Sequence, residues 1–138
     1  MGLWLVKSDP ESYAFADLER DRRTVWDGVA NALALRHLGG MRPGDECLVY
    51  ESGKVKAVVG LARVAGAPRP DPGEDDPRRL VVDLEATGRL ARAVTLAEIK
   101  ADPRFAELPL VTHSRLSVMP IPRAAYRALV ALGKRTKG

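Results

Sequence analysis

The sequence predicts a small α+β protein built on a mixed β barrel rather than a doubly wound parallel sheet. Apolar, β-branched segments typical of strands outnumber the long amphipathic segments typical of helices. Some of these segments lie close enough in the chain to form hairpins, whereas others are separated by helical insertions. The 138 residues supply one sizeable hydrophobic core and are too few for two, so we expect a single domain over residues 1–138.

Composition and charge narrow the class of protein further. Apolar residues make up 46% and charged residues 29%, as in an ordinary soluble domain. A net charge of +4 permits a polyanionic partner, but 22 basic against 18 acidic residues is only a mild excess. The single cysteine, Cys47, cannot form an internal disulfide, and no apolar run is long enough for a signal peptide or a membrane span. We therefore expect a cytoplasmic monomer without a membrane partner.

The first strand and helix are predicted from short apolar segments and from the residues that end them. Residues 2–7 are almost continuously apolar, which predicts a central strand that ends at Ser8 before Asp9-Pro10. Residues 11–20 predict a short helix, and residues 24–26 a brief extended segment.

The stretch from residue 25 to residue 52 is the densest in unusual residues. Asp27-Gly28 predicts a chain reversal, because Gly tolerates positive φ and Asp can bond its own backbone. Asn31 is expected to cap a helix over residues 32–38, and Gly39-Gly40 is expected to end that helix in a left-handed conformation.

A hairpin is predicted next. Pro43-Gly44 suits the two central positions of a type II turn that leads into a strand at residues 47–50. After a reversal at Gly53-Lys54, the β-branched residues 57–64 predict its partner strand, where Gly60 indicates a bulge or a close backbone approach.

The second half begins with a surface loop over residues 65–79, which is rich in Pro, Gly and Asp and should be the most mobile segment. A strand is predicted at residues 80–84, and residues 91–94 are expected either to extend it or to follow it after a turn at Thr87-Gly88.

The last elements carry clear end signals. Thr95 and Glu98 match a capping box for a helix that ends near Asp102. Residues 114–119 predict an alternating strand, and residues 122–132 predict a final helix with Pro in its first turn.

The motifs of several common enzyme classes are absent from the sequence. His37 and His113 have no partners at metal-ligand spacing, so we expect no metal, and no nucleotide or phosphate fingerprint predicts a cofactor. A triad of Ser117, His113 and an aspartate has no supporting spacing, and Cys47 lies in an apolar strand where a buried, inert thiol is expected.

Residues that suit recognition of a planar base fall at strand ends and turns. They comprise aromatic rings, an amide, hydroxyls and bases: Trp4, Trp26, Tyr50, Asn31, Ser8, Ser52, Ser114, Ser117, Lys7 and Arg115. Bases are bound by stacking and by hydrogen bonds to their edges. The structural alternative stays open for each of them: Trp26 as a core plug, Asn31 as a plain cap, Trp4 and Tyr50 as core, and Arg115 as a surface arginine.

Seven blocks, in order along nearly the whole chain, resemble the EVE domain family. They are residues 4–10 (WLVKSDP), 26–31 (WDGVAN), 44–45 with 50–52 (GD and YES), 59–62 (VGLA), 70–72 (PDP), 95–100 (TLAEIK) and 115–120 (RLSVMP). The resemblance implies a PUA-like mixed β pseudo-barrel flanked by short helices, the architecture shared with YTH, ASCH and base-flipping SRA domains.

The resemblance also implies a function and a site. It implies a non-catalytic reader of a modified nucleobase, with modified cytosine in DNA as the leading ligand and RNA as the competitor. Trp26 would stack on the base or wall the pocket, Asn31 and Ser8 would address a base edge, and Lys7 and Arg115 would meet phosphate or polar base groups. The implied ligand-binding residues are Lys7, Ser8, Trp26, Asn31, Tyr50, Ser52, Arg115 and Ser117.

Three positions depart from the family pattern and leave the choice of ligand open. Ala30 replaces a usual Arg, Glu51 replaces a frequent His, and Arg79-Leu80 stand where an aromatic residue is common. An acid at position 51 would repel phosphate unless it faces an amino group. Two rival functions remain: an enzyme acting on a nucleotide or modified base, for which no general base is evident, and a module that binds a small molecule or protein.

Overall fold

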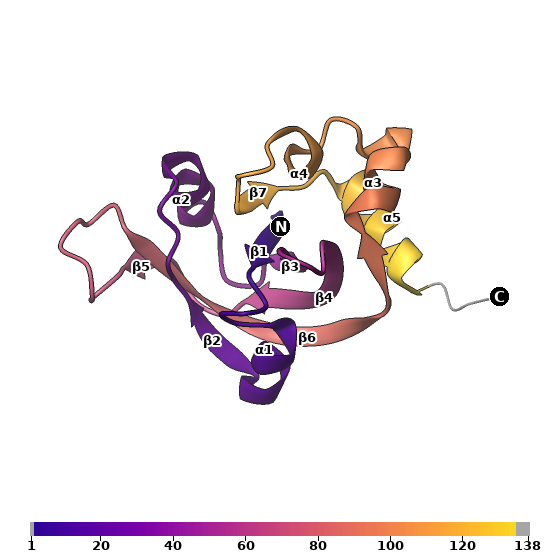
Figure 1. Cartoon of the computed structure of the whole chain (residues 1–138). Helices are drawn as coiled ribbons and strands as arrows, with labels where there is room; N and C mark the ends of the chain where they lie inside the picture. Colours follow the sequence, from indigo (N-terminus) through magenta and orange to yellow (C-terminus); the bar gives the residue numbers. More distant parts are fainter. Residues whose placement is uncertain (1, 135–138) are drawn as a thin grey trace.

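A strongly curved β-sheet forms the centre of the protein, and a computed structural model describes it over residues 2–134 (Figure 1). The strands are β1 (Leu3–Ser8), β2 (Arg23–Trp26), β3 (Glu46–Glu51), β4 (Ala57–Val64), β5 (Arg69–Pro70), β6 (Leu80–Thr95) and β7 (Val118–Pro120). Their order is β2-β6-β4-β3-β1-β7, with β5 paired to the start of β6. The sheet curls into a half-barrel, which confirms the predicted mixed barrel.

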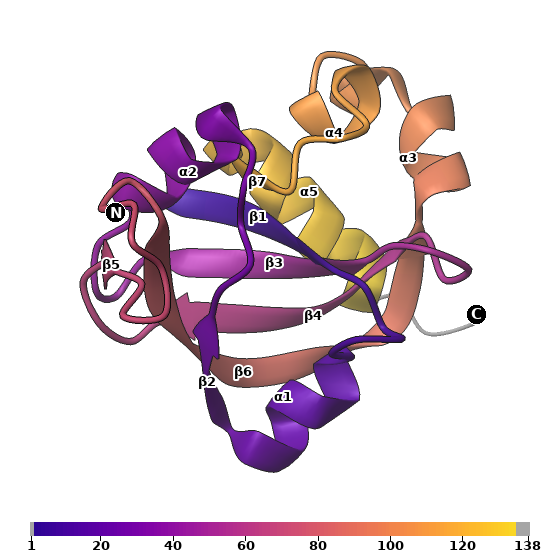
Figure 2. The same cartoon turned by 60° about the vertical axis from the view of Figure 1, so that its left-hand side comes forward.

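Short helices surround this sheet. They are α1 (Phe15–Asp21), α2 (Ala32–Gly39), α3 (Leu96–Ala101), the 3-10 helix η1 (Pro103–Phe105), α4 (Pro109–Thr112) and α5 (Arg123–Lys134). Figure 2 shows α5 behind the sheet, while the linker from β2 to α2 crosses in front of it. No helix within residues 2–134 has the length and apolar character needed to cross a membrane.

The predicted hairpin is confirmed, and β3 also pairs with β1 in parallel. The β3–β4 register shifts between Val49 and Tyr50, where Val49 pairs with Gly60 and Tyr50 with Val58. A Cβ at Gly60 would lie 2.2 Å from Cζ of Phe15, a ring that is only 1% exposed. Gly60 therefore serves both predicted purposes, as part of a bulge and as a close approach.

The predicted turn at Thr87-Gly88 is wrong, and of the two alternatives for residues 91–94 the structure confirms the one in which they extend the strand. β6 runs without interruption from Leu80 to Thr95. Leu61 pairs with Gly88 and Ala62 with Ala86, so Thr87 is an extra residue that the ladder absorbs as a bulge. The glycine therefore bends the strand rather than ending it.

Two predicted helix N-caps are confirmed, whereas one predicted helix end is wrong. The Asn31 side chain accepts from the backbone N–H of Ala34, and Thr95 with Glu98 forms the predicted capping box. The left-handed stop at Gly39-Gly40 is wrong, since Gly40 has φ −88° and Gly39 is still helical. Helix α1 begins at Phe15, later than predicted, because turns after Asp9 occupy the preceding residues.

The segment before β7 differs most from its prediction. Residues 114–117 do not belong to the strand: the N–H of Leu116 donates to the carbonyl of His113 and closes a turn at residues 114–115. The strand is therefore only Val118–Pro120. The short helices η1 and α4, each with Pro at its start, were missed because neither is long enough to show a period.

Candidate functional site

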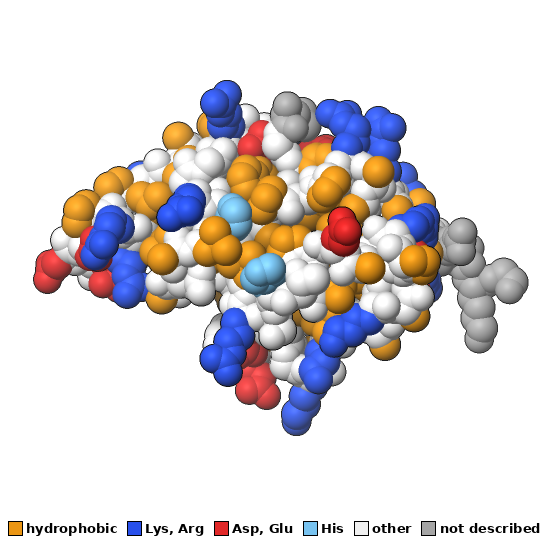
Figure 3. All heavy atoms as spheres, turned by 90° about the horizontal axis from the view of Figure 1, so that it is seen from above, with side chains coloured by type: hydrophobic (Ala, Val, Ile, Leu, Met, Phe, Trp, Pro, Cys, Tyr) orange, Lys and Arg blue, Asp and Glu red, His pale blue; other side chains and the backbone are white. Residues whose placement is uncertain are grey.

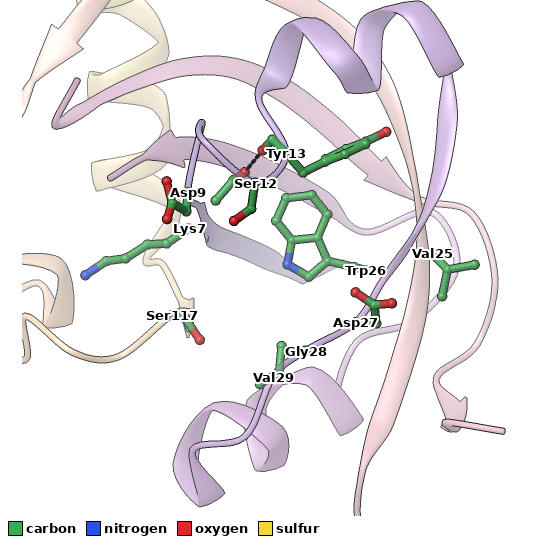
Figure 4. Close-up of a pocket in the computed structure, with 11 residues that line it drawn as sticks. Lys7, Asp9, Ser12, Tyr13, Val25, Trp26, Asp27, Gly28, Val29 and Ser117 are labelled. Carbon is green, nitrogen blue, oxygen red and sulfur yellow. Dashed lines mark hydrogen bonds between the residues drawn. The ribbon is translucent and has the colours of Figure 1, made fainter. Parts of the chain in front are cut away.

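A pocket lies at the open side of the half-barrel, where β1 ends and the linker from β2 to α2 passes over the sheet (Figure 4). We call it the Trp26 pocket. Its volume is about 380 Å³, and it is lined by the end of β1, the turn after it, β2, residues 27–29 and Ser117. The curl of the sheet creates this pocket, because β1 and β2 are far apart in the strand order.

Trp26 forms one wall of this pocket. Its side chain is 8% exposed, and its backbone is fixed by pairing of Trp26 with Val82 of β6. Figure 4 shows the indole nitrogen on the side of the ring that faces the cavity. The hydrogen bonds found among residues 2–134 include none from Nε1, and the structure leaves no fully buried side-chain nitrogen or oxygen unpaired there, so this donor is accessible to a ligand. Gly28, at φ +73°, makes the predicted reversal that carries the chain over the opening.

Hydroxyls and carboxylates supply the remaining polar groups of the pocket. Ser117 and Ser12 lie on its border together with Asp9 and Asp27 (Figure 4). The sequence interpretation missed Asp9, Ser12 and Asp27, although all three flank Pro10 or Gly28 as polar turn residues. Such turn residues are common on any surface, so only the fold shows that they share one cavity.

Ser8 lines the pocket, but its hydroxyl is already engaged. It donates to the carbonyl oxygen of Tyr13 and so holds the turn between β1 and α1. The carbonyl of Ser8 accepts from the backbone N–H of Ser52 at 2.9 Å and from its hydroxyl at 3.2 Å. Ser8 and Ser52 thus tie the ends of β1 and β3 together.

Lys7 lies between the Trp26 pocket and a second hollow. Its Nζ donates to the carbonyl of Ser114 at 2.8 Å and lies 5.6 Å from the ring centre of Tyr50. Partial burial lowers the pKa of Lys7 below its usual value. The second hollow, of about 290 Å³, contains Lys7, Tyr50 and Ser52, and we call it the lysine hollow because Lys56 and Lys100 also line it.

Asn31 and Arg115 lie in neither of these cavities. They border a third, shallow depression of about 330 Å³ between the start of α2 and the loop after α4. The side-chain oxygen Oδ1 of Asn31 caps α2 by accepting from the backbone N–H of Ala34 at 3.0 Å, which leaves the side-chain NH₂ group available. Trp26 and Asn31 therefore line separate hollows rather than one pocket. Arg115 is exposed, as are most side chains of this turn.

The structure shows where the residues that depart from the family pattern lie. Glu51 is 9% exposed and accepts from the backbone N–H of Phe15 at 2.8 Å, so it faces the interior rather than a bound phosphate. Ala30 and Leu80 both line a groove of about 580 Å³ between α2 and the loop before β6. Ala30 and Leu80 are smaller than the Arg and the aromatic residue common in the family at these positions, and they leave that groove open.

The residues that the sequence raised for metal binding or nucleophilic chemistry have the following surroundings. Within residues 2–134, no group of three His, Cys, Asp or Glu side chains is placed to hold a metal ion. Cys47 is fully buried, and burial raises the pKa of its thiol strongly, which disfavours the nucleophilic thiolate. His113 Nδ1 lies 2.7 Å from the Thr112 hydroxyl, so that ring nitrogen is engaged locally rather than with Ser117.

A curled mixed sheet with short helices and a pocket at its open side defines a PUA-like α+β domain. A solved YTH domain from Zygosaccharomyces rouxii shares this fold with a TM-score of 0.64 at 16% identity. The sequence matches the EVE domain family over residues 2–132, and the chain belongs to that family.

Relatives and solved structures span almost all of the chain. Human thymocyte nuclear protein 1 is 28% identical over 94% of this chain and 72% of its own length. An NMR structure of a Rhodopseudomonas palustris protein superposes with a TM-score of 0.91 at 34% identity, covering 96% of this chain and 93% of that one. Human THYN1 in complex with DNA containing 5-methylcytosine has a TM-score of 0.90 at 26% identity, covering 99% and 100%.

Proposed function

We propose that this EVE domain binds nucleic acid and reads one modified base, most favourably a modified cytosine in DNA, in the Trp26 pocket. The observation that carries the proposal is a cavity walled by a buried tryptophan whose indole N–H has no partner within residues 2–134. A volume of about 380 Å³ lies within the range of small-ligand pockets. The human relative solved with DNA containing 5-methylcytosine supports the same ligand class.

The polar groups of the pocket favour a base that carries an amino group. Carboxylates accept hydrogen bonds, and the amino groups of cytosine and adenine donate them. Asp9 and Asp27 provide acceptors at the border, while Trp26 Nε1 and the Ser117 hydroxyl provide donors for ring nitrogen or carbonyl positions. Val29 adds apolar contact surface for a methyl substituent. Thymine, which has no amino group, would leave the carboxylates unpaired.

The base must leave its stack to enter this pocket, so the ligand is a single strand or a duplex with a flipped nucleotide. The proposed role is binding without covalent chemistry and without a cofactor. A monomeric domain in a reducing, cytoplasmic compartment is part of the same proposal.

The test is a titration with matched oligonucleotides that carry cytosine, 5-methylcytosine, 5-hydroxymethylcytosine or N6-methyladenine, as DNA and as RNA. Preference for one modified base is expected in the unaltered protein. Trp26→Phe keeps an aromatic wall but removes the N–H donor, whereas Trp26→Ala removes both. Loss of a stacking partner costs about 1–3 kcal/mol, so Trp26→Ala should erase most of the preference.

Trp4→Phe is the matched control, because the Trp4 indole donates to Asp45 and does not line the Trp26 pocket. Thermal unfolding of all variants separates loss of fold from loss of binding. Equal preference in the folded Trp26→Ala and Trp4→Phe proteins would contradict a base site at Trp26. Preference for RNA over DNA would mean that the ligand is a modified RNA base, and the proposed site at Trp26 would be unchanged.

A further inference from the structure

The lysines of this protein are distributed very unevenly. Residues 2–134 contain five lysines, and four of them line the lysine hollow or an adjoining hollow of about 390 Å³. We call these four the lysine platform: Lys7, Lys54, Lys56 and Lys100. They come from the end of β1, the β3–β4 turn and α3, which Figure 2 shows at the same end of the sheet.

The platform carries charge that no acidic side chain neutralises. All nine ion pairs found among residues 2–134 use arginine as the base, so none involves a platform lysine. The two hollows have no Asp or Glu among their described lining residues. The neighbouring Trp26 pocket, in contrast, contains Asp9 and Asp27. Positive charge is thus concentrated on one side of Lys7.

The backbone beneath the platform is firmly held. Lys56 has φ +49°, a left-handed conformation that a non-glycine residue adopts only where the surrounding structure holds it. The N–H of Leu96 donates to the carbonyl of Lys56 at 2.8 Å and joins the β3–β4 turn to the start of α3. Helix α3 is in turn fixed by its capping box and by the Arg92–Glu98 ion pair. The spacing of the lysine backbones is therefore set by the fold.

The surroundings of the lysines suit a sugar-phosphate chain rather than an isolated ion. Val55, which is 42% exposed, and Leu96 lie among the lysines as apolar contact surface for sugars. The hydroxyls of Ser52 and Ser114 border the lysine hollow as hydrogen-bonding groups. Figure 3 shows the same mixture more widely on the face of α2, α4 and α3, with hydrophobic side chains gathered centrally and Lys and Arg mostly around the margin.

We propose that the lysine platform binds backbone phosphates of the same strand whose base enters the Trp26 pocket. Lys7 lines both the pocket and the lysine hollow, so a strand leaving the pocket meets the platform directly. This inference rests on the proposed base-reading function and extends it. The ligand is an oligonucleotide with phosphates on one side of the modified base, not a free modified nucleoside.

The test replaces Lys54, Lys56 and Lys100 together by Gln in the full chain, and Lys134→Gln alone serves as the control. Lys134 is the remaining described lysine and lies in α5, outside both hollows. Affinity for a single-stranded oligonucleotide with 5-methylcytosine is measured from about 50 to 200 mM salt. Each lost phosphate contact lowers the slope of log K against log salt by about 0.7, so the triple variant should lose about 2 from the slope.

The two proposals fail in different ways. An unchanged salt slope in the folded triple variant would overturn the platform, whatever its base preference. A reduced slope with an unchanged ratio of affinities for modified and plain strands supports the platform. If no protein prefers the modified base while the slope still falls, the platform stands as a backbone site and the base-reading function is lost. Binding of 5-methyl-2′-deoxycytidine alone should be equal in the triple variant and the unaltered protein.

Discussion

The Trp26 pocket and the lysine platform adjoin each other but differ in every physical respect. The pocket combines a buried ring with directional donors and acceptors, including two carboxylates. The platform combines four ammonium groups outside the ion pairs found within residues 2–134, three of them on exposed lysines and one on the partly buried Lys7, with small apolar contacts. Carboxylates weaken the attraction of any phosphate, whereas unpaired lysines attract all phosphates alike. The comparison indicates that the pocket supplies selectivity for the base and the platform supplies affinity for the strand, and that Lys7 borders both regions.

The largest effect is expected from a change that breaks both regions at once. In Gly60→Ala, the new Cβ would lie 2.2 Å from Cζ of the buried Phe15 ring. Overpacking of this kind costs about 3 kcal/mol, at the upper end of the usual range. Thermal unfolding should show the loss, and base preference and salt slope should deteriorate together.

Gly88→Ala is the matched control for this change, since nothing lies within 4 Å of a Cβ at that position. It should be close to neutral. Phe15→Leu removes the outer ring atoms, so the double variant with Gly60→Ala should lose less stability than the two single variants added together. Full additivity would contradict the close contact.

An intermediate effect is expected from a change that lowers stability but spares both binding regions. Asp45 is 4% exposed and accepts from the backbone N–H groups of Gly2 and Arg42 and from the indole of Trp4. Burial alone would raise the pKa of Asp45, but these hydrogen bonds outweigh it and lower the pKa below 3.8. Asp45→Ala should cost about 2 kcal/mol at neutral pH.

Because the pKa of Asp45 is lower in the folded state, its stabilising effect is complete above about pH 4. It is lost as the pH falls through the folded pKa. The difference in Tm between the unaltered protein and Asp45→Ala should therefore shrink in acid. A difference that stays constant down to pH 2 would contradict the charge-assisted bonds. Base preference and salt slope at neutral pH should not change in the folded variant.

The smallest effect concerns the residue that the two regions share. Lys7→Gln removes one charge and keeps a side chain able to donate to the carbonyl of Ser114. The salt slope should fall by about 0.7, and affinity at low salt by about 1 kcal/mol or less. Burial lowers the pKa of Lys7, so as the pH rises the unaltered protein should lose this contribution before the exposed lysines titrate. An unchanged salt slope in Lys7→Gln would contradict a phosphate contact at Lys7.

The sequence predicted features whose causes lie within a few residues. The Asn31 cap, the Thr95 capping box and the turn at Pro43-Gly44 all appear in the structure, with Gly44 at φ +92° and Asp45 N–H donating to Arg42 at 3.0 Å. The resemblance to the EVE domain, resting on seven blocks in order, was confirmed and supplied the PUA-like fold.

Features that depend on the curl of the sheet were not predictable from single segments. The bulge at Thr87 occurs within a ladder that only the partner strand defines. The same curl places Asp9 and Asp27 on the border of one cavity, whereas Trp26 and Asn31, five positions apart in the chain, line different hollows. Grouping of polar residues into one cavity is a property of the tertiary fold, and no local period reveals it.

The length of β6 has a consequence for how this family can vary. Val82 pairs with Trp26 near the start of the strand, and Thr95 pairs with Ala57, next to Lys56, at its end. Unless a bulge absorbs the change, as at Thr87, inserting or deleting one residue between them would turn every later side chain to the opposite face of the sheet. It would also displace α3 relative to the pocket. Mutational libraries should therefore tolerate many substitutions along β6 but few changes of its length.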